Sequence, residues 1–148
     1  MARVSTYLNF MGTTEEAFRF YAGVFGTEIT APITRMTDGG EMPGGPTLTD
    51  AEKNLVMHME VEILAGHLLQ GTDMIGSMGH ELKIGNNTTI NLEPDTREET
   101  ERLYALLSEG ATECAPLADM PWGALWGTCL DRFGIRWMFN HYHDGPPQ

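Results

Sequence analysis

The sequence predicts an α+β fold in which two tandem βαβββ modules form a curled mixed sheet around a groove. The main observation is that a strand, a capped helix and further strands are predicted in the same order in each half of the chain. The second observation is size, because 148 residues with 41% apolar residues suit one domain with a single core. We therefore expect residues 1–148 to fold as one domain.

The first module is predicted at about 3–71. Residues 4–10 have the β-branched and aromatic content of a strand. Thr13 and Glu16 fit the S/T-x-x-E capping box, and an apolar stripe predicts a helix over 14–25 that Gly26 ends. Further strands are expected at 27–36, at 55–63, where apolar residues alternate with polar ones, and at 67–70. Residues 38–54 have loop chemistry, and we expect this loop to cover either its own pocket or a partner's.

The second module is predicted at about 87–142, after a glycine-rich linker at about 72–86 and before a short C-terminal tail. Residues 88–93 read as a strand, and Thr96 with Glu99 forms a second capping box. The following helix should end at Gly110, and strands are expected near 112–118, 125–130 and 135–140.

The two helices match in sequence as well as in type. The residues that match in order are Thr13, Glu15, Glu16, Tyr21 and Ala22 with Thr96, Glu98, Glu99, Tyr104 and Ala105. We infer an internal repeat. Each module would cover one sheet face with its helix, and the two remaining faces together would form the groove, which is the usual place for a ligand.

Charge and composition exclude several kinds of partner. The net charge of −12 opposes binding to nucleic acid or to an anionic membrane, and no apolar run approaches the roughly 20 residues of a membrane span. The N-terminus lacks the apolar region of a secretory signal, so we expect this acidic protein in the cytoplasm. Cys114 and Cys129 show no C-x-x-C spacing, and both are predicted to be small buried hydrophobes.

Three stretches resemble PhnB-like proteins of the vicinal oxygen chelate superfamily, which includes glyoxalase I, bleomycin-resistance proteins and extradiol dioxygenases. They are Tyr7-Leu8-Asn9-Phe10 with the helix that follows, Val56-Met57-His58, and Trp126-Gly127-Thr128 with the run from Asp131 to Trp137. The last run is similar to Asp-Pro-Phe-Gly-x-x-Trp, with Arg132 in place of proline. The resemblance implies paired modules, a homodimer and a small-molecule ligand in the groove.

The resemblance also implies positions for a divalent metal, which in this sequence are Ser5, Gln70, Thr89 and Met138. Only Gln70 among them is a plausible ligand, so the usual positions do not support a metal and the cofactor stays unknown. The branch has also carried a demethylubiquinone methyltransferase label. We expect no methyl transfer, because the glycine pairs near 39 and 44 are not placed between a strand and a helix.

Strand alternation predicts which side chains face the groove. His58 and Glu60 are two residues apart, so their side chains lie on one face of the strand. They could act as an acid–base pair, form half of a metal site, or be ordinary polar surface. Trp122 could wall the pocket or, with Trp126, pack at a subunit interface. Arg136 could bind an anion or pair with an acid. The full set of predicted lining residues is Tyr7, Asn9, His58, Glu60, Gln70, Thr89, Asn91, Trp122, Arg136 and Met138.

Three functions fit these observations. The first is a PhnB-like protein or enzyme that binds a small molecule in the groove. The second is a metal-dependent lyase, isomerase or oxygenase of the glyoxalase or dioxygenase type, with His58 and Glu60 as non-standard catalytic residues. The third is a bleomycin-resistance-like protein that sequesters an aromatic or cationic drug in an acidic groove.

Overall fold

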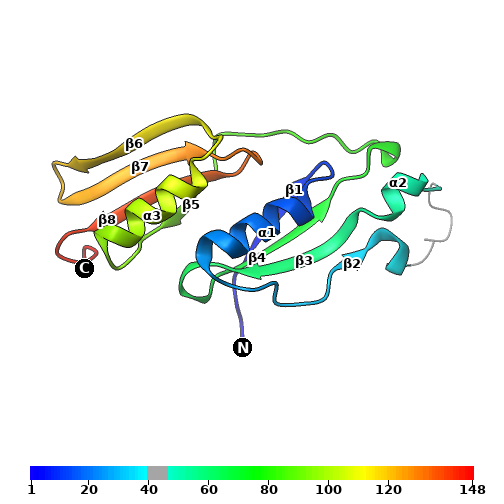
Figure 1. The fold of residues 1–148 in the computed structure, drawn as a ribbon, viewed down its shortest axis with the longest axis horizontal. Coiled ribbons are helices and arrows are strands. Elements are labelled where there is room, and N and C mark those ends of the chain that lie inside the picture. The colour runs from blue at the N-terminus through cyan, green and yellow to red at the C-terminus, as the bar shows by residue number, and fades with distance from the viewer. Residues whose placement is uncertain (40–46) are drawn as a thin grey trace. The chain divides into compact units, whose positions relative to one another are not determined.

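The computed structural model describes residues 1–39 and 47–148 (Figure 1). These residues divide into two compact units, Met1–Lys83 and Ile84–Gln148, and each unit holds one of the predicted modules. Each unit contains one four-stranded mixed sheet and one main helix. The predicted α+β fold with two βαβββ modules is confirmed.

In the first unit the strands lie in the order β1-β4-β3-β2. Strand β1 runs parallel to β4, whereas β4 with β3 and β3 with β2 are antiparallel. The first strand of the module is therefore an edge strand that pairs with the last one. The bounds are β1 (Thr6–Phe10), α1 (Thr14–Phe25), β2 (Thr34–Arg35), α2 (Asp50–Lys53), β3 (Val56–Glu62) and β4 (Leu68–Asp73).

The second unit repeats this arrangement in the order β5-β8-β7-β6. Strand β5 is parallel to β8, and the other two pairs are antiparallel. The bounds are β5 (Ile90–Leu92), α3 (Arg97–Leu107), β6 (Thr112–Met120), β7 (Ala124–Leu130) and β8 (Arg136–Tyr142).

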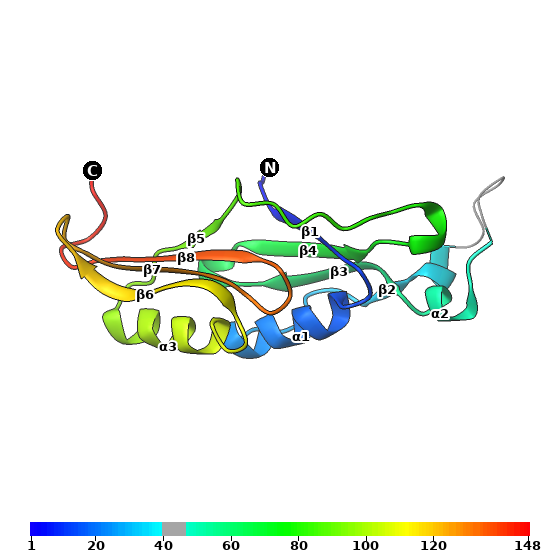
Figure 2. The same cartoon turned by 90° about the horizontal axis from the view of Figure 1, so that it is seen from above.

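Each main helix lies against one face of its own sheet (Figure 2). In the first unit Phe18 and Tyr21 of α1 are fully buried against that face, and the rings of Phe10 and Phe18 meet edge to face at 6.1 Å. In the second unit Tyr104 of α3 meets the ring of Phe139 at 5.1 Å. Apolar burial under the helix, worth roughly 25 cal/mol per Å², therefore holds each unit together.

Helix α1 approaches its sheet most closely over Gly71 of β4. A methyl group placed on Gly71 would stand 2.6 Å from Cζ of Phe18 and 3.2 Å from Cγ2 of Thr14. Both of those side chains are fully buried, so neither can move aside cheaply. The absence of a side chain at Gly71 sets how near the helix can lie.

The buried carboxylate of Asp73, at the end of β4, caps α1 and is only 4% exposed. Its Oδ1 accepts hydrogen bonds from the backbone N–H of Gly12 at 3.0 Å and of Thr14 at 3.1 Å, and from the Thr14 hydroxyl at 2.6 Å. Its Oδ2 accepts one from the backbone N–H of Val56 at 2.9 Å. One side chain thus joins the turn before α1, the start of α1 and the start of β3.

The capping box predicted at Thr13 is therefore wrong, because Thr13 precedes α1 but makes no side-chain cap bond. The Asp73 carboxylate serves the helix N-terminus instead. The second predicted cap is confirmed in part, since Thr96 accepts a hydrogen bond from the backbone N–H of Glu99 at 3.1 Å. Gly26 ends α1 in the left-handed conformation as expected.

Four other expectations differ from the structure. Of the strand predicted at 27–36, only β2 and an isolated bridge between Ile29 and Val61 form, since Pro32 has no N–H to donate. The loop predicted at 38–54 contains α2, although residues 40–46 lie outside the described part. In the strand predicted at 55–63, alternation puts Val56 on the same side as the polar residues His58 and Glu60, yet Val56 is 1% exposed. Cys129 is buried as predicted, but Cys114 lies exposed on the edge strand β6.

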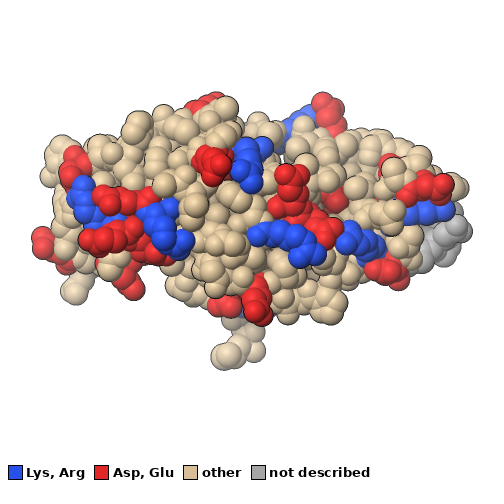
Figure 3. All heavy atoms as spheres, in the orientation of Figure 1, with Lys and Arg blue, Asp and Glu red and all other residues tan. Residues whose placement is uncertain are grey.

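Charged side chains of both signs gather over α1 and α3 on the face drawn in Figure 3. Arg19 pairs with Glu15 at 2.7 Å on α1, and Arg102 pairs with Glu99 at 2.7 Å on α3. These exposed pairs contribute little to stability. None of the helices in the two described ranges combines the length and the apolar character that crossing a bilayer requires.

Replacing Asp73 with asparagine should lower the free energy of unfolding by about 2–3 kcal/mol, because an NH2 group would face buried N–H donors. Urea denaturation measures this. The control is Asp50→Asn, whose side chain is fully exposed and should leave the transition midpoint unchanged. Equal effects of the two substitutions would contradict the capping role of Asp73.

Two glycine substitutions should have opposite signs. Gly71→Ala should destabilise the protein by about 1–3 kcal/mol, because the new methyl group overlaps Phe18. Gly23→Ala in α1 should stabilise it by about 0.5–1 kcal/mol, since that position is open and alanine favours the helix. Thermal unfolding of both variants is the measurement, and a stabilising Gly71→Ala would refute the close approach.

Candidate functional site

The predicted lining residues of the first unit share one sheet face. Gln70 of β4 stands between Tyr7 of β1 and Glu60 of β3 in the strand register. Residues directly opposite in neighbouring strands point to the same side, and Gly71, one residue further, points to α1. The face opposite α1, which we call the polar face, therefore carries Tyr7, Asn9, His58, Glu60, Gln70 and Thr72.

The side chains of His58 and Glu60 contact each other on the polar face. His58 Nε2 lies 3.1 Å from Glu60 Oε1, and the Thr30 hydroxyl lies 3.5 Å from Glu60 Oε2. The side chains of His58 and Glu60 are 33% and 22% exposed, so a ligand can reach them. A carboxylate held on one imidazole nitrogen orients the ring, which is the arrangement of an acid–base pair.

Tyr7 and Gln70 extend this group across the sheet. The Tyr7 ring, 52% exposed, lies 6.2 Å from the His58 ring at an angle of 37°. The Gln70 amide donates a hydrogen bond to the Ser5 hydroxyl at 2.8 Å, which fixes the amide and leaves its oxygen as an acceptor. The polar face thus combines an aromatic ring, an acid–base pair and an oriented amide.

The second unit places other predicted residues on the face opposite α3. Met138 of β8 lies between Asn91 of β5 and Thr128 of β7, and Asn140 lies opposite Trp126. Oδ1 of Asn140 is buried without a hydrogen-bond partner among the described residues. Thr89 is exposed just before β5. This face offers an aromatic ring and amides but, among its described side chains, no acid–base pair.

Two of the predicted residues, Trp122 and Arg136, had alternative roles that depend on their surroundings. Trp122 stands in the turn between β6 and β7, where it is 60% exposed. Arg136 already binds groups within its own unit, since Nη2 lies 2.7 Å from Glu113 Oε2 and Nε donates to the carbonyl of Gly85 at 2.7 Å. Of the two alternatives for Arg136, binding an anion or pairing with an acid, the structure shows pairing with Glu113.

The positions at which the superfamily holds a metal carry poor donors in this chain. Ser5 and Thr89 offer hydroxyls, Met138 a thioether, and the Gln70 amide is bound to Ser5. Zinc, nickel and iron sites use histidine, cysteine or carboxylate ligands. Within the described ranges no three such side chains gather in a group that could hold a metal ion. Ser5, Gln70, Thr89 and Met138 therefore do not fit a divalent metal of the kind that the superfamily binds.

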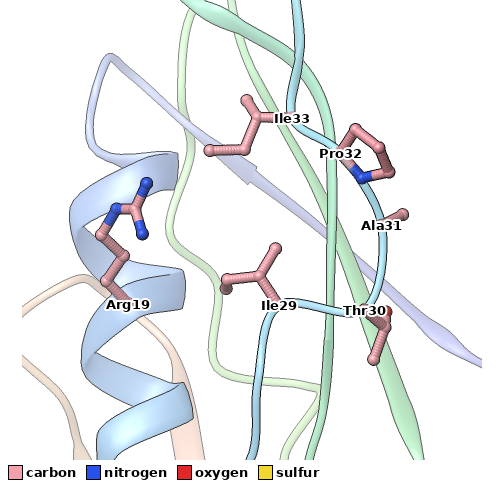
Figure 4. A pocket seen from close by; sticks show the side chains of 6 residues that line it. All are labelled: Arg19, Ile29, Thr30, Ala31, Pro32 and Ile33. Atoms are coloured by element: carbon pink, nitrogen blue, oxygen red, sulfur yellow. The ribbon is translucent and has the colours of Figure 1, made fainter.

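A separate hollow of about 360 Å³ lies beside α1 (Figure 4). The side chains of Ile29 and Ile33 point toward the helix there, and Arg19 extends from the helix itself. The guanidinium of Arg19 donates to Glu15 Oε2 through Nε and Nη2. The nearby Arg35 and Arg19 lower the pKa of Glu15. None of the predicted site residues lines this hollow, whose lining residues are Arg19, Ile29, Thr30, Ala31, Pro32 and Ile33.

The sequence-based prediction omitted some residues of these faces. Strand alternation places Asn140 on the same face as Arg136 and Met138, as the structure has it. Thr72 continues the alternation of Gln70 and could have been included on that ground. Thr30 could not, because it lies outside a regular strand and reaches Glu60 through the irregular path of residues 29–33.

The paired βαβββ units, each with a helix on one sheet face, have the fold of the vicinal oxygen chelate superfamily. A family model described as 3-demethylubiquinone-9 3-methyltransferase matches residues 2–139, and the chain belongs to this family, the PhnB-like branch of the superfamily. No curated protein matches the sequence.

Several solved structures share the fold over nearly the whole chain. Protein PA1353 from Pseudomonas aeruginosa is 28% identical with a TM-score of 0.77, covering 96% of this chain and 98% of its own. A putative 3-demethylubiquinone-9 3-methyltransferase, PhnB protein, from Bacillus cereus is 23% identical with a TM-score of 0.74, covering 95% and 99%. A glyoxylase/bleomycin resistance protein/dioxygenase domain from Frankia sp. EAN1pec is 12% identical with a TM-score of 0.63, covering 99% and 96%.

Proposed function

We propose that this protein binds a small polar molecule on the polar face of its first unit and transfers a proton to or from it. The observation that carries the proposal is the 3.1 Å contact between His58 and Glu60 beside the exposed ring of Tyr7. Glu60 orients the imidazole, so a ligand over Tyr7 can meet His58 as acid or base and Gln70 as acceptor. Membership of a superfamily that includes both binding proteins and enzymes supports this proposal.

The proposed roles do not require a metal. His58 supplies the proton-transferring nitrogen, Glu60 orients its ring, and the aromatic face of Tyr7 contacts the apolar part of the ligand. The expected substrate class is therefore a small molecule with an ionisable O–H, N–H or activated C–H group. Homodimer formation and a cytoplasmic location, which the sequence suggests, stay predictions that light scattering and cell fractionation would test.

Thermal unfolding in the presence of hydroxy acids, oxo acids, phenols and S-adenosylmethionine tests the proposal. A ligand that binds only the native state at 100 times its Kd adds about 2.7 kcal/mol of stability and raises the Tm. We expect a shift with at least one polar acid or phenol and none with S-adenosylmethionine. His58→Ala and Glu60→Gln should abolish the shift, whereas Glu16→Gln, exposed on α1, should retain it.

The outcome that contradicts the proposal is a ligand shift that survives both His58→Ala and Glu60→Gln. A stoichiometric divalent ion in protein purified without a histidine tag, lost in those variants, would instead favour the metal-dependent alternative with His58 and Glu60 as ligands.

The second unit favours a second candidate, a bleomycin-resistance-like protein that sequesters a planar drug. The observation is the half-buried Trp126, which lies opposite Asn140 on the face opposite α3. The Oδ1 of Asn140 is buried without a partner in the part of the chain that the structure describes. An aromatic ligand could stack on the half-buried indole, next to the Asn140 side chain. Binding of this kind would need no acid–base pair.

Tryptophan fluorescence separates this candidate from the first. A planar cationic drug bound at this face should quench the fluorescence of the protein, and Trp126→Phe should remove most of the quenching. Trp122→Phe, in the exposed turn, should leave it largely intact. Quenching that depends on Trp122 alone would exclude sequestration on the sheet face.

A further inference from the structure

The two cysteines lie side by side at an irregularity of the second sheet. In the pairing of β6 with β7, Thr112 is opposite Leu130 and Ala115 is opposite Thr128. Two residues of β6, Glu113 and Cys114, therefore share the place opposite Cys129. Such a bulge requires an unusual backbone, and Glu113 has a φ of +49° in the left-handed region.

Both sulfur atoms are on the face that α3 covers. Cys129 lies opposite Trp137, which is fully buried, and Cys129 itself is 2% exposed. Glu113 points to the other face, where it pairs with Arg136 at 2.7 Å. After the bulge Ala115 lies opposite Thr128, on the face away from α3, so Cys114, one residue earlier, points to the α3 side as Cys129 does.

Electrostatics agree with this placement. Burial and, secondarily, the nearby Cys114 thiol raise the pKa of Cys129 to about 12. Burial raises the pKa of Tyr104 as well, with Cys114 and Cys129 adding to the effect. The Tyr104 hydroxyl donates to the carbonyl of Ala115 at 3.3 Å, directly beside Cys114. The two thiols and this hydroxyl thus form one cluster under α3.

The two thiols differ in their access to solvent. Cys114 is exposed on β6, the outermost strand of its sheet, whereas Cys129 is enclosed. Cys114 and Cys129 lie on adjacent strands at the bulge. Adjacent strands are about 4.7–4.9 Å apart, and disulfides join Cα atoms roughly 4.4–6.8 Å apart, so a small adjustment of β6 can bring the two sulfur atoms together. An edge strand with a bulge can make the small adjustment that bond formation needs, because one of its sides has no neighbouring strand.

We propose that Cys114 and Cys129 are a thiol pair that a small disulfide oxidant converts to a reversible intrachain disulfide. The Cys114 thiolate attacks one sulfur of the oxidant, the oxidant's S–S bond breaks, and one thiolate leaves. Cys129 then loses its proton to water and attacks the Cys114 sulfur of the mixed disulfide, releasing the second thiolate. Two protein thiols are oxidised and one oxidant disulfide is reduced to two thiols.

The test uses an excess of the chromogenic aromatic disulfide 5,5′-dithiobis(2-nitrobenzoate) with the folded chain. The wild type should release two coloured thiolates per chain and end without an adduct, two hydrogens lighter than the reduced protein. The second release should lag behind the first, because burial keeps Cys129 protonated. Digestion should yield one peptide pair joined through Cys114 and Cys129.

Matched variants identify the role of each thiol. Cys129→Ser and Cys129→Ala should release one thiolate and keep the aromatic adduct on Cys114. Cys114→Ser should react at least about tenfold more slowly than the wild type, since only the buried thiol remains. All three variants should release one thiolate per chain in urea, which shows that the remaining cysteine is chemically competent.

The proposal is overturned if the folded wild type releases two thiolates but retains two adducts, or stops at one adduct on Cys114. It is equally overturned if the disulfide joins two chains. Melting curves of the variants before oxidation identify any that are unfolded, and Cys129→Ala then serves in place of Cys129→Ser.

Discussion

The first unit depends on one buried carboxylate. Asp73 comes from the last strand and receives four hydrogen bonds from segments that are distant in sequence. A buried charge without such partners would be costly, so these donors both stabilise it and are positioned by it. The second unit has a comparable group in Asp131, whose carboxylate accepts from the Trp137 indole at 2.8 Å and from the backbone N–H groups of Phe133 and Ile135.

The duplicated units keep the same frame and differ in what they present. On the faces under the helices, apolar side chains fill both cores in similar ways. On the opposite faces, the first unit carries His58 and Glu60 while the second carries Trp126 and Asn140. A repeat can diverge in this way because residues on the face away from the helix contribute little to core packing, so they can change without loss of the fold.

Local patterns predicted the local features well. The bounds of α1 and the shared face of the first-unit site residues followed from spacing and alternation, which depend only on neighbouring residues. Features that failed involve distant partners. Thr13 is not a side-chain cap because Asp73, far along the chain, takes that role. For Arg136 the sequence left two alternatives open, and the partner that decides between them, Glu113, lies more than twenty residues away. The bulge that brings Cys114 opposite Cys129 has no sequence signal, since glutamate rarely takes its left-handed backbone.

The parallel pairing of first and last strands also constrains how the protein can form during synthesis. Strand β1 leaves the ribosome before the other strands of its unit. Its sheet neighbour among the described residues, β4, is the last strand of the unit to appear. The first sheet therefore cannot grow strand by strand, and it closes only once the chain has emerged as far as residue 73. By then none of the second module has emerged, so the nascent chain can complete one sheet before the strands that could compete for its edges exist.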